Sequence, residues 1–77
     1  MPDNITGERI RKVRHQLRHD QADLVVILEE KCGLRLTQSD ISKIEQGQRY
    51  VKDYELNALA EALNVSPTWL LRGGEEK

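Results

Sequence analysis

The chain has 77 residues, and its 12 Lys and Arg side chains stand against 13 Asp and Glu side chains, a formal net charge of −1. This length is too short for two domains or for the large α/β folds that house most enzymes. One cysteine cannot form an internal disulfide, and no stretch approaches the roughly 20 apolar residues of a membrane span. We therefore expect one small cytoplasmic domain, residues 1–77, with its core inside 5–72 and a mobile tail at 73–77.

The charge is distributed unevenly along the chain. Residues 1–52 hold ten basic and eight acidic side chains, whereas residues 53–77 hold two basic and five acidic ones. The first part is net positive and the second net negative, which permits a basic face on the first two thirds without demanding one.

The spacing of apolar residues predicts five short helices. The first covers residues 5–18, with Asn4 or Thr6 as its cap, and its inward stripe consists of Ile10, Val13 and Leu17. The second follows the N-cap Asp20 and ends at Gly33, which suits the left-handed conformation.

An extended link at 34–36 buries two leucines and leads to a third helix at 38–46. Thr37 is its predicted N-cap, and Asp40 follows three residues later in a capping-box arrangement. Gly47 ends this helix, and its inward apolar residues are Ile41 and Ile44.

A polar loop at 48–52 precedes the fourth helix, for which Asp53 is the predicted cap and Asn64 the left-handed exit. Ser66 and Pro67 are a strong start signal for a short fifth helix, because proline suits the first helical position.

The residues with catalytic or metal-binding chemistry are few. His15 and His19 lie four residues apart on the first helix, which places both over one candidate metal ion, but nothing is placed to complete a tetrahedral set. Cys32 lacks an identifiable base and is interpreted as a core or boundary residue. We expect no enzyme activity and no cofactor, with metal binding by the two histidines as a lesser hypothesis.

The third predicted helix presents short and medium polar side chains outward: Thr37, Gln38, Ser39, Ser42 and Lys43. A helix in the DNA major groove needs such donors and acceptors near its N-terminal end to read base edges. The alternative is a surface helix without a partner, but idle helix surface is more often filled with long Glu and Lys side chains. The composition favours a DNA-reading helix.

Four segments stand in a recognisable order: GERIRKVR at 7–14, DQADL at 20–24, ISKIEQGQR at 41–49 and LAEALNVSPTWLL at 59–71. Together they resemble the helix-turn-helix family of phage lambda-type repressors and Cro, often called the XRE family, over residues 5–72. The resemblance implies an all-α, five-helix DNA-binding domain that acts as a homodimer on palindromic operators. The span from 21 to 41 is about six residues longer than a compact helix-turn-helix, so we expect an extended second helix and connector.

The resemblance also implies roles for individual residues. Base edges would be contacted by the five outward residues of the third helix. The DNA backbone would be contacted by Gln21, Gln46, Gln48, Arg49 and Lys52. Arg14 and Glu45 match a structural pair that ties the first helix to the third. Arg18 and His19 stand where the family usually has Gly and Leu, and Asp40 is interpreted as a cap rather than as a contact to cytosine.

The fifth predicted helix is unusually apolar for its length. Pro67, Trp69 and Leu70 are the predicted dimer contacts, and the alternative is that the apolar residues of this helix are all buried in the monomer. The predicted function is a sequence-specific regulator of transcription, a repressor, that binds double-stranded DNA. The alternative is an antitoxin-like or regulator-sequestering protein-interaction module with weak or no DNA binding, which the acidic balance supports.

Overall fold

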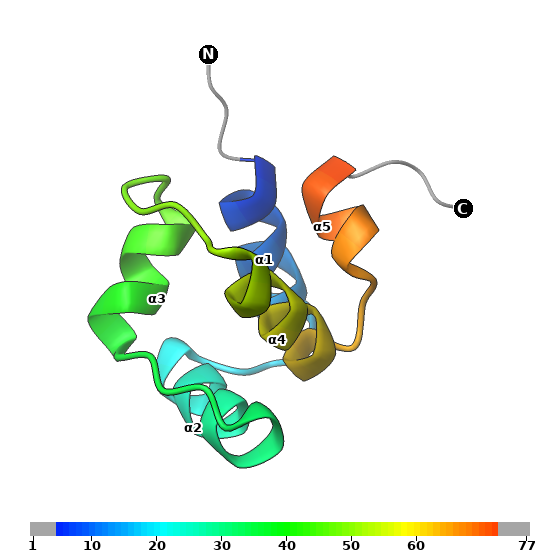
Figure 1. Ribbon diagram of the computed structural model, residues 1–77. Helices are drawn as coiled ribbons and strands as arrows, with labels where there is room; N and C mark the ends of the chain where they lie inside the picture. Colours follow the sequence, from blue (N-terminus) through cyan, green and yellow to red (C-terminus); the bar gives the residue numbers. More distant parts are fainter. Residues whose placement is uncertain (1–4, 73–77) are drawn as a thin grey trace.

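The computed structural model describes residues 5–72, which fold into five helices (Figure 1). They are α1 (Ile5–Gln16), α2 (Gln21–Cys32), α3 (Gln38–Glu45), α4 (Asp53–Leu63) and α5 (Pro67–Arg72). The all-helical prediction is confirmed, including the long α2 and the extended connector at 33–37. The candidate cap Asn4 and the predicted tail at 73–77 lie outside the described residues.

The first helix ends earlier than the sequence predicts. Arg18 has a φ of 62°, in the left-handed region, and its backbone N–H donates to His15 O at 2.9 Å. Because α1 stops at Gln16, Leu17 leaves the inward stripe and is 42% exposed, so its predicted burial is wrong. Thr6 lies inside α1 rather than capping it, and its hydroxyl donates to Leu70 O at 3.2 Å.

Two capping boxes confirm the predicted starts of α2 and α3. Asp20 accepts from the backbone N–H of Asp23 at 2.8 Å, and the Asp23 carboxylate accepts from Asp20 N at 3.0 Å. The exits of α2 and α4 at Gly33 and Asn64 are both left-handed, as predicted.

The predicted cap of α4 is wrong by one residue. Lys52 is the N-cap and Asp53 is the first helical residue, because Glu55 rather than Asp53 accepts the Lys52 backbone N–H, at 3.0 Å. A carboxylate on the third helical residue satisfies this donor without any side chain from the cap itself.

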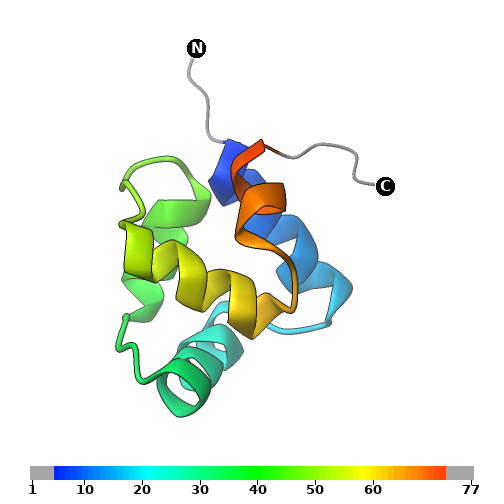
Figure 2. The same ribbon diagram turned by 45° about the vertical axis from the view of Figure 1, so that its right-hand side comes forward.

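One apolar core holds the five helices together. Its buried members are Ile10, Val13, Leu24, Leu28, Leu36, Ile41, Ile44, Ala58, Leu59, Ala60, Ala62, Leu63 and Leu70. The main packed pairs are α2 with α4, α1 with α5, and both α1 and α2 with α3. Figures 1 and 2 show α4 between α3 and α5 in both views, so α3 and α5 occupy different faces of the molecule.

The core assignment predicts unequal effects of two truncations in α2. Leu28→Ala should lower the free energy of unfolding by about 2–5 kcal/mol, because this 0% exposed side chain leaves a cavity. Val26→Ala, at a 52% exposed position on the same helix, should change it by less than about 0.5 kcal/mol. Urea denaturation followed by circular dichroism measures both, and equal losses would contradict the assignment.

Candidate nucleic-acid interface

The outward side of α3 is polar and exposed. Ile41, Ile44 and Glu45 are buried against the rest of the molecule, whereas the exposed residues are Gln38, Ser39 and Lys43. Ser39 and Lys43 are four residues apart and therefore share one side of the helix. Ser42 is half-buried, and its Oγ accepts from Gln46 Nε2 at 3.0 Å.

The N-terminal end of α3 is closed by a reciprocal cap. Thr37 Oγ1 accepts from Asp40 N at 3.0 Å, and Asp40 Oδ2 accepts from Thr37 N at 2.9 Å. The backbone hydrogen bond from Thr37 lowers the pKa of Asp40, so its carboxylate stays ionised at the positive end of the helix. Asp40 is engaged as a cap, the role that the sequence favoured. Thr37 uses its oxygen as an acceptor in the same cap.

A buried ion pair anchors the C-terminal end of α3 to α1. Arg14 donates from Nε to Glu45 Oε2 at 2.7 Å and from Nη2 to Glu45 Oε1 at 3.0 Å. A third bond runs from Arg14 Nη1 to His19 O at 2.9 Å. The bond to Glu45 raises the pKa of Arg14, so the guanidinium is charged at any physiological pH.

Gln21 extends this anchor to α2. As the first residue of α2, it donates from Nε2 to Glu45 Oε1 at 3.2 Å. Three helices therefore meet at one carboxylate, and Gln21 braces α3 from α2.

A polar hollow of about 440 Å³ opens at this junction. It is lined by Arg11, Arg14, His15, Gln21, Glu45 and Gln46. Arg11 is an exposed cation beside two of the predicted backbone-contacting residues, and the sequence analysis did not select it. The sequence contained a signal for this position: Arg11 lies three residues before Arg14, so the two are neighbours on α1 and Arg11 lies near the partner of Arg14 on α3.

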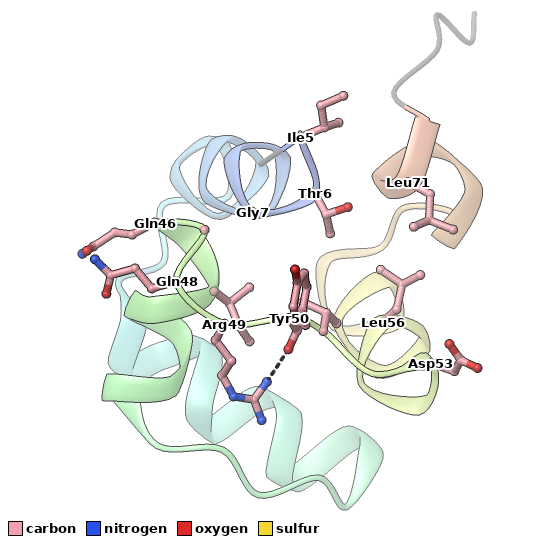
Figure 3. Close-up of a pocket in the computed structure, with 13 residues that line it drawn as sticks. Ile5, Thr6, Gly7, Gln46, Gln48, Arg49, Tyr50, Asp53, Leu56 and Leu71 are labelled. Carbon is pink, nitrogen blue, oxygen red and sulfur yellow. Dashed lines mark hydrogen bonds between the residues drawn. The ribbon is translucent and has the colours of Figure 1, made fainter. Parts of the chain in front are cut away.

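The loop after α3 contains four of the predicted backbone-contacting residues. Gln46, Gln48 and Lys52 are exposed, and in Figure 3 the first two point away from Leu71. Arg49 differs, because it donates from Nη1 and Nη2 to the two oxygens of Glu55, both at 2.9 Å. The guanidinium of Arg49, for which a phosphate contact was predicted, is thus engaged with Glu55 within the protein.

A cleft of about 880 Å³ with a mixed polar and apolar lining lies between the start of α1, this loop and α5 (Figure 3). Ile5, Tyr50 and Leu71 line it and are exposed. Leu70 is 0% exposed and completes the core, so its prediction as a surface contact is wrong; the next residue, Leu71, is 56% exposed instead. The end of α5 turns Leu70 toward α1, where its carbonyl accepts from Thr6.

The predicted dimer contacts Pro67 and Trp69 are both half-buried. The guanidinium of Arg9 lies over the Trp69 ring, 5.6 Å from its centroid, and this contact joins α5 to α1. Pro67 shares a side of α5 with Leu71, four residues later.

Comparison with known proteins places this architecture in a family. A family described as a helix-turn-helix domain matches residues 7–76. The chain belongs to the helix-turn-helix family. The HTH-type transcriptional regulator DicA of Escherichia coli (strain K12) is 37% identical over 75 residues, which cover 96% of this chain and 51% of that protein. This helix-turn-helix chain thus spans about half the length of the curated relative, and no solved structure matches it significantly.

The remaining chemistry-bearing residues of this helix-turn-helix chain do not converge on a site. Among residues 5–72, no group of three or more His, Cys, Asp and Glu side chains is arranged to hold a metal ion. Cys32 is half-buried, its Sγ lies 3.5 Å from Ala58 O, and burial raises the pKa of its thiol. Across the same described residues, every helix is too short or too polar to cross a bilayer.

The buried ion pair predicts that Arg14→Ala destabilises the domain rather than only weakening ligand binding. The substitution leaves Glu45 buried without its main partner, and the expected loss is about 3–5 kcal/mol of unfolding free energy. Arg11→Ala, at an exposed position on the same helix, is the matched control, with an expected change of about 0.5 kcal/mol or less. Thermal melts followed by circular dichroism measure both; nearly unchanged melting of Arg14→Ala would contradict the structural role.

Proposed function

We propose that this chain is a sequence-specific reader of double-stranded DNA that inserts α3 into the major groove. The observation that carries the proposal is the contrast between the two sides of α3. Its inner side is held by a buried ion pair to α1, while Gln38 and Ser39 in the capped first turn and Lys43 in the last turn are exposed to solvent. A rigid helix with exposed donors and acceptors is what base-edge recognition requires.

The residues around α3 suit contacts to phosphates. Gln46, Gln48 and Lys52 are exposed on the loop after α3, and Arg11 lies beside Gln21 at the polar hollow. Such contacts set the register of the protein on the duplex, while the α3 side chains discriminate bases. Thr37 and Ser42 complete the proposed reading set. Each hydroxyl oxygen accepts a hydrogen bond within the protein, so each would contact DNA by donating its hydroxyl hydrogen.

The printed name of the curated relative, a transcriptional regulator, supports regulation of transcription by this chain. We propose repression, in which the chain occupies an operator and blocks access to it. Because the match covers about half of that relative, the likeness concerns the helix-turn-helix portion.

We propose that the DNA-bound form is a homodimer. Reading a palindrome requires two α3 helices about 34–36 Å apart, one turn of DNA. The exposed apolar side chains of Ile5, Tyr50 and Leu71 gather at the cleft beside the loop that follows α3. A second copy covering this cleft would bury them across a two-fold axis. Pro67 and Trp69 stay in the proposed surface, and Leu71 takes the place of Leu70.

The second candidate function is a protein-interaction module on the same fold. The observation in its favour is the net charge of −1, since phosphate binding draws on basic residues. Binding to duplex DNA separates the two functions.

The DNA-reading function predicts salt-dependent binding to a random-sequence duplex. Fluorescence anisotropy should show a binding constant whose logarithm falls by about 0.9 per phosphate contact for each unit rise in the logarithm of salt concentration. Absence of duplex binding at low salt would contradict DNA reading and favour the interaction module.

Base reading by α3 predicts that Gln38→Ala should lose about 1–3 kcal/mol of discrimination at one base pair of a duplex selected from a random pool. The matched control Asn57→Ala, exposed on α4, should lose none.

The dimer predicts a specific effect of charge at the cleft. Leu71→Glu should shift the sedimentation coefficient toward the monomer, because it puts a carboxylate into the proposed apolar contact. Val26→Glu, at a similarly exposed position on α2, is the matched control and should leave the dimer intact. A wild-type chain that stays monomeric on its selected duplex would contradict the proposal.

A further inference from the structure

Arg49 links the start of α3 to the start of α4. Its guanidinium forms a two-bond ion pair with Glu55, and Nη1 also donates to Tyr50 O at 3.1 Å. On its other edge, Nε lies 3.8 Å from Asp40 Oδ1, the carboxylate that caps α3. Asp40, Arg49 and Glu55 therefore form one charged chain, which we call the clasp, across the loop at 46–52.

The clasp joins two helices that are not among the main packed pairs of the molecule. α3 packs chiefly on α1 and α2, while α4 packs on α1, α2 and α5. The ion pair between Arg14 and Glu45 holds only the C-terminal end of α3. The clasp connects the N-terminal end of α3, which carries the proposed base-reading residues Gln38 and Ser39, to the start of α4.

The burial of Glu55 makes the clasp a firm connection. Glu55 is 2% exposed, and its carboxylate accepts both from Arg49 and from the Lys52 backbone N–H. The hydrogen bonds from Arg49 lower the pKa of Glu55, and the same bonds raise the pKa of Arg49, so both groups are charged. A buried carboxylate without a partner carries a large free-energy penalty, which favours the arrangement in which Arg49 stays paired with Glu55.

We propose that Arg49 is a positioning residue for DNA reading, which holds the loop at 46–52 and the N-terminal turn of α3 in place without touching DNA. This proposal rests on the proposed DNA-reading function. It assigns Arg49 a role opposite to that of its loop neighbours Gln48 and Lys52, whose exposed side chains are the candidates for phosphate contact.

Three substitutions distinguish positioning from phosphate contact. Arg49→Lys keeps a positive charge, which serves a phosphate, but lysine cannot form two parallel bonds to a carboxylate. Glu55→Gln breaks the ion pair and leaves Arg49 charged and released, which would strengthen a phosphate contact. Arg49→Gln removes the charge, and Lys52→Gln is the matched control from the same loop.

The experiment measures binding to two duplexes, one selected from a random pool by the wild-type chain and one of random sequence, over a range of salt concentrations. Circular dichroism first establishes a temperature at which each variant is folded. We expect Arg49→Lys, Arg49→Gln and Glu55→Gln each to weaken binding to the selected duplex about tenfold. None should change the salt slope on the random duplex, whereas Lys52→Gln should lower that slope by about 0.9.

The double variant Arg49→Gln/Glu55→Gln should lose no more affinity than either single variant, because both remove one interaction. Wild-type affinity in Arg49→Lys, tighter binding in Glu55→Gln, or a reduced slope in Arg49→Gln would overturn the positioning role. A wild-type chain that binds neither duplex would instead overturn the proposed function and this inference with it.

Discussion

The buried ion pair between Arg14 and Glu45 is the interaction on which the arrangement of α3 depends. Two charges removed from water are stable only when each finds its partner in good geometry, and Arg14 meets Glu45 through two bonds and His19 O through a third. Gln21 adds a donor from α2 to the same carboxylate. Because Glu45 is the last residue of α3, this pair fixes the C-terminal end of the helix against α1, while Ile41 and Ile44 bury its inner side in the core.

The clasp supplies a corresponding restraint at the other end of α3. Both connections use an arginine that a sequence inspection counts among the positive charges, yet neither arginine is exposed. The number of exposed positive charges is therefore smaller than the count of basic residues suggests. Exposed positive charges are found on side chains such as Arg11, Lys43 and Lys52. For the proposed function, this means that contacts from α3 and assembly on the duplex count for more than general attraction to phosphate.

Local signals were sufficient wherever a helix end is set by its own neighbours in sequence. The cap of α3 by Thr37 and Asp40 needs only three residues of chain, so it was predictable, as was the left-handed Gly33. The end of α1 was not, because Arg18 adopts a left-handed conformation that usually selects glycine, and one hydrogen bond from Arg14 to His19 O supports that turn. The N-cap of α4 was likewise displaced from Asp53 to Lys52 by the carboxylate of Glu55.

By itself, the sequence determined the helix-turn-helix family, the five helices and the polar outer side of α3, because these follow from periodicity, caps and motifs within short stretches. Only the tertiary structure decided which side chains are buried or paired inside the molecule. Leu70 is buried and Leu71 exposed because α5 packs on α1, and Arg49 turns inward because Glu55, six residues later, is buried beside it. The burial of these side chains depends on contacts between helices, which cannot be predicted from the periodicity of a single helix.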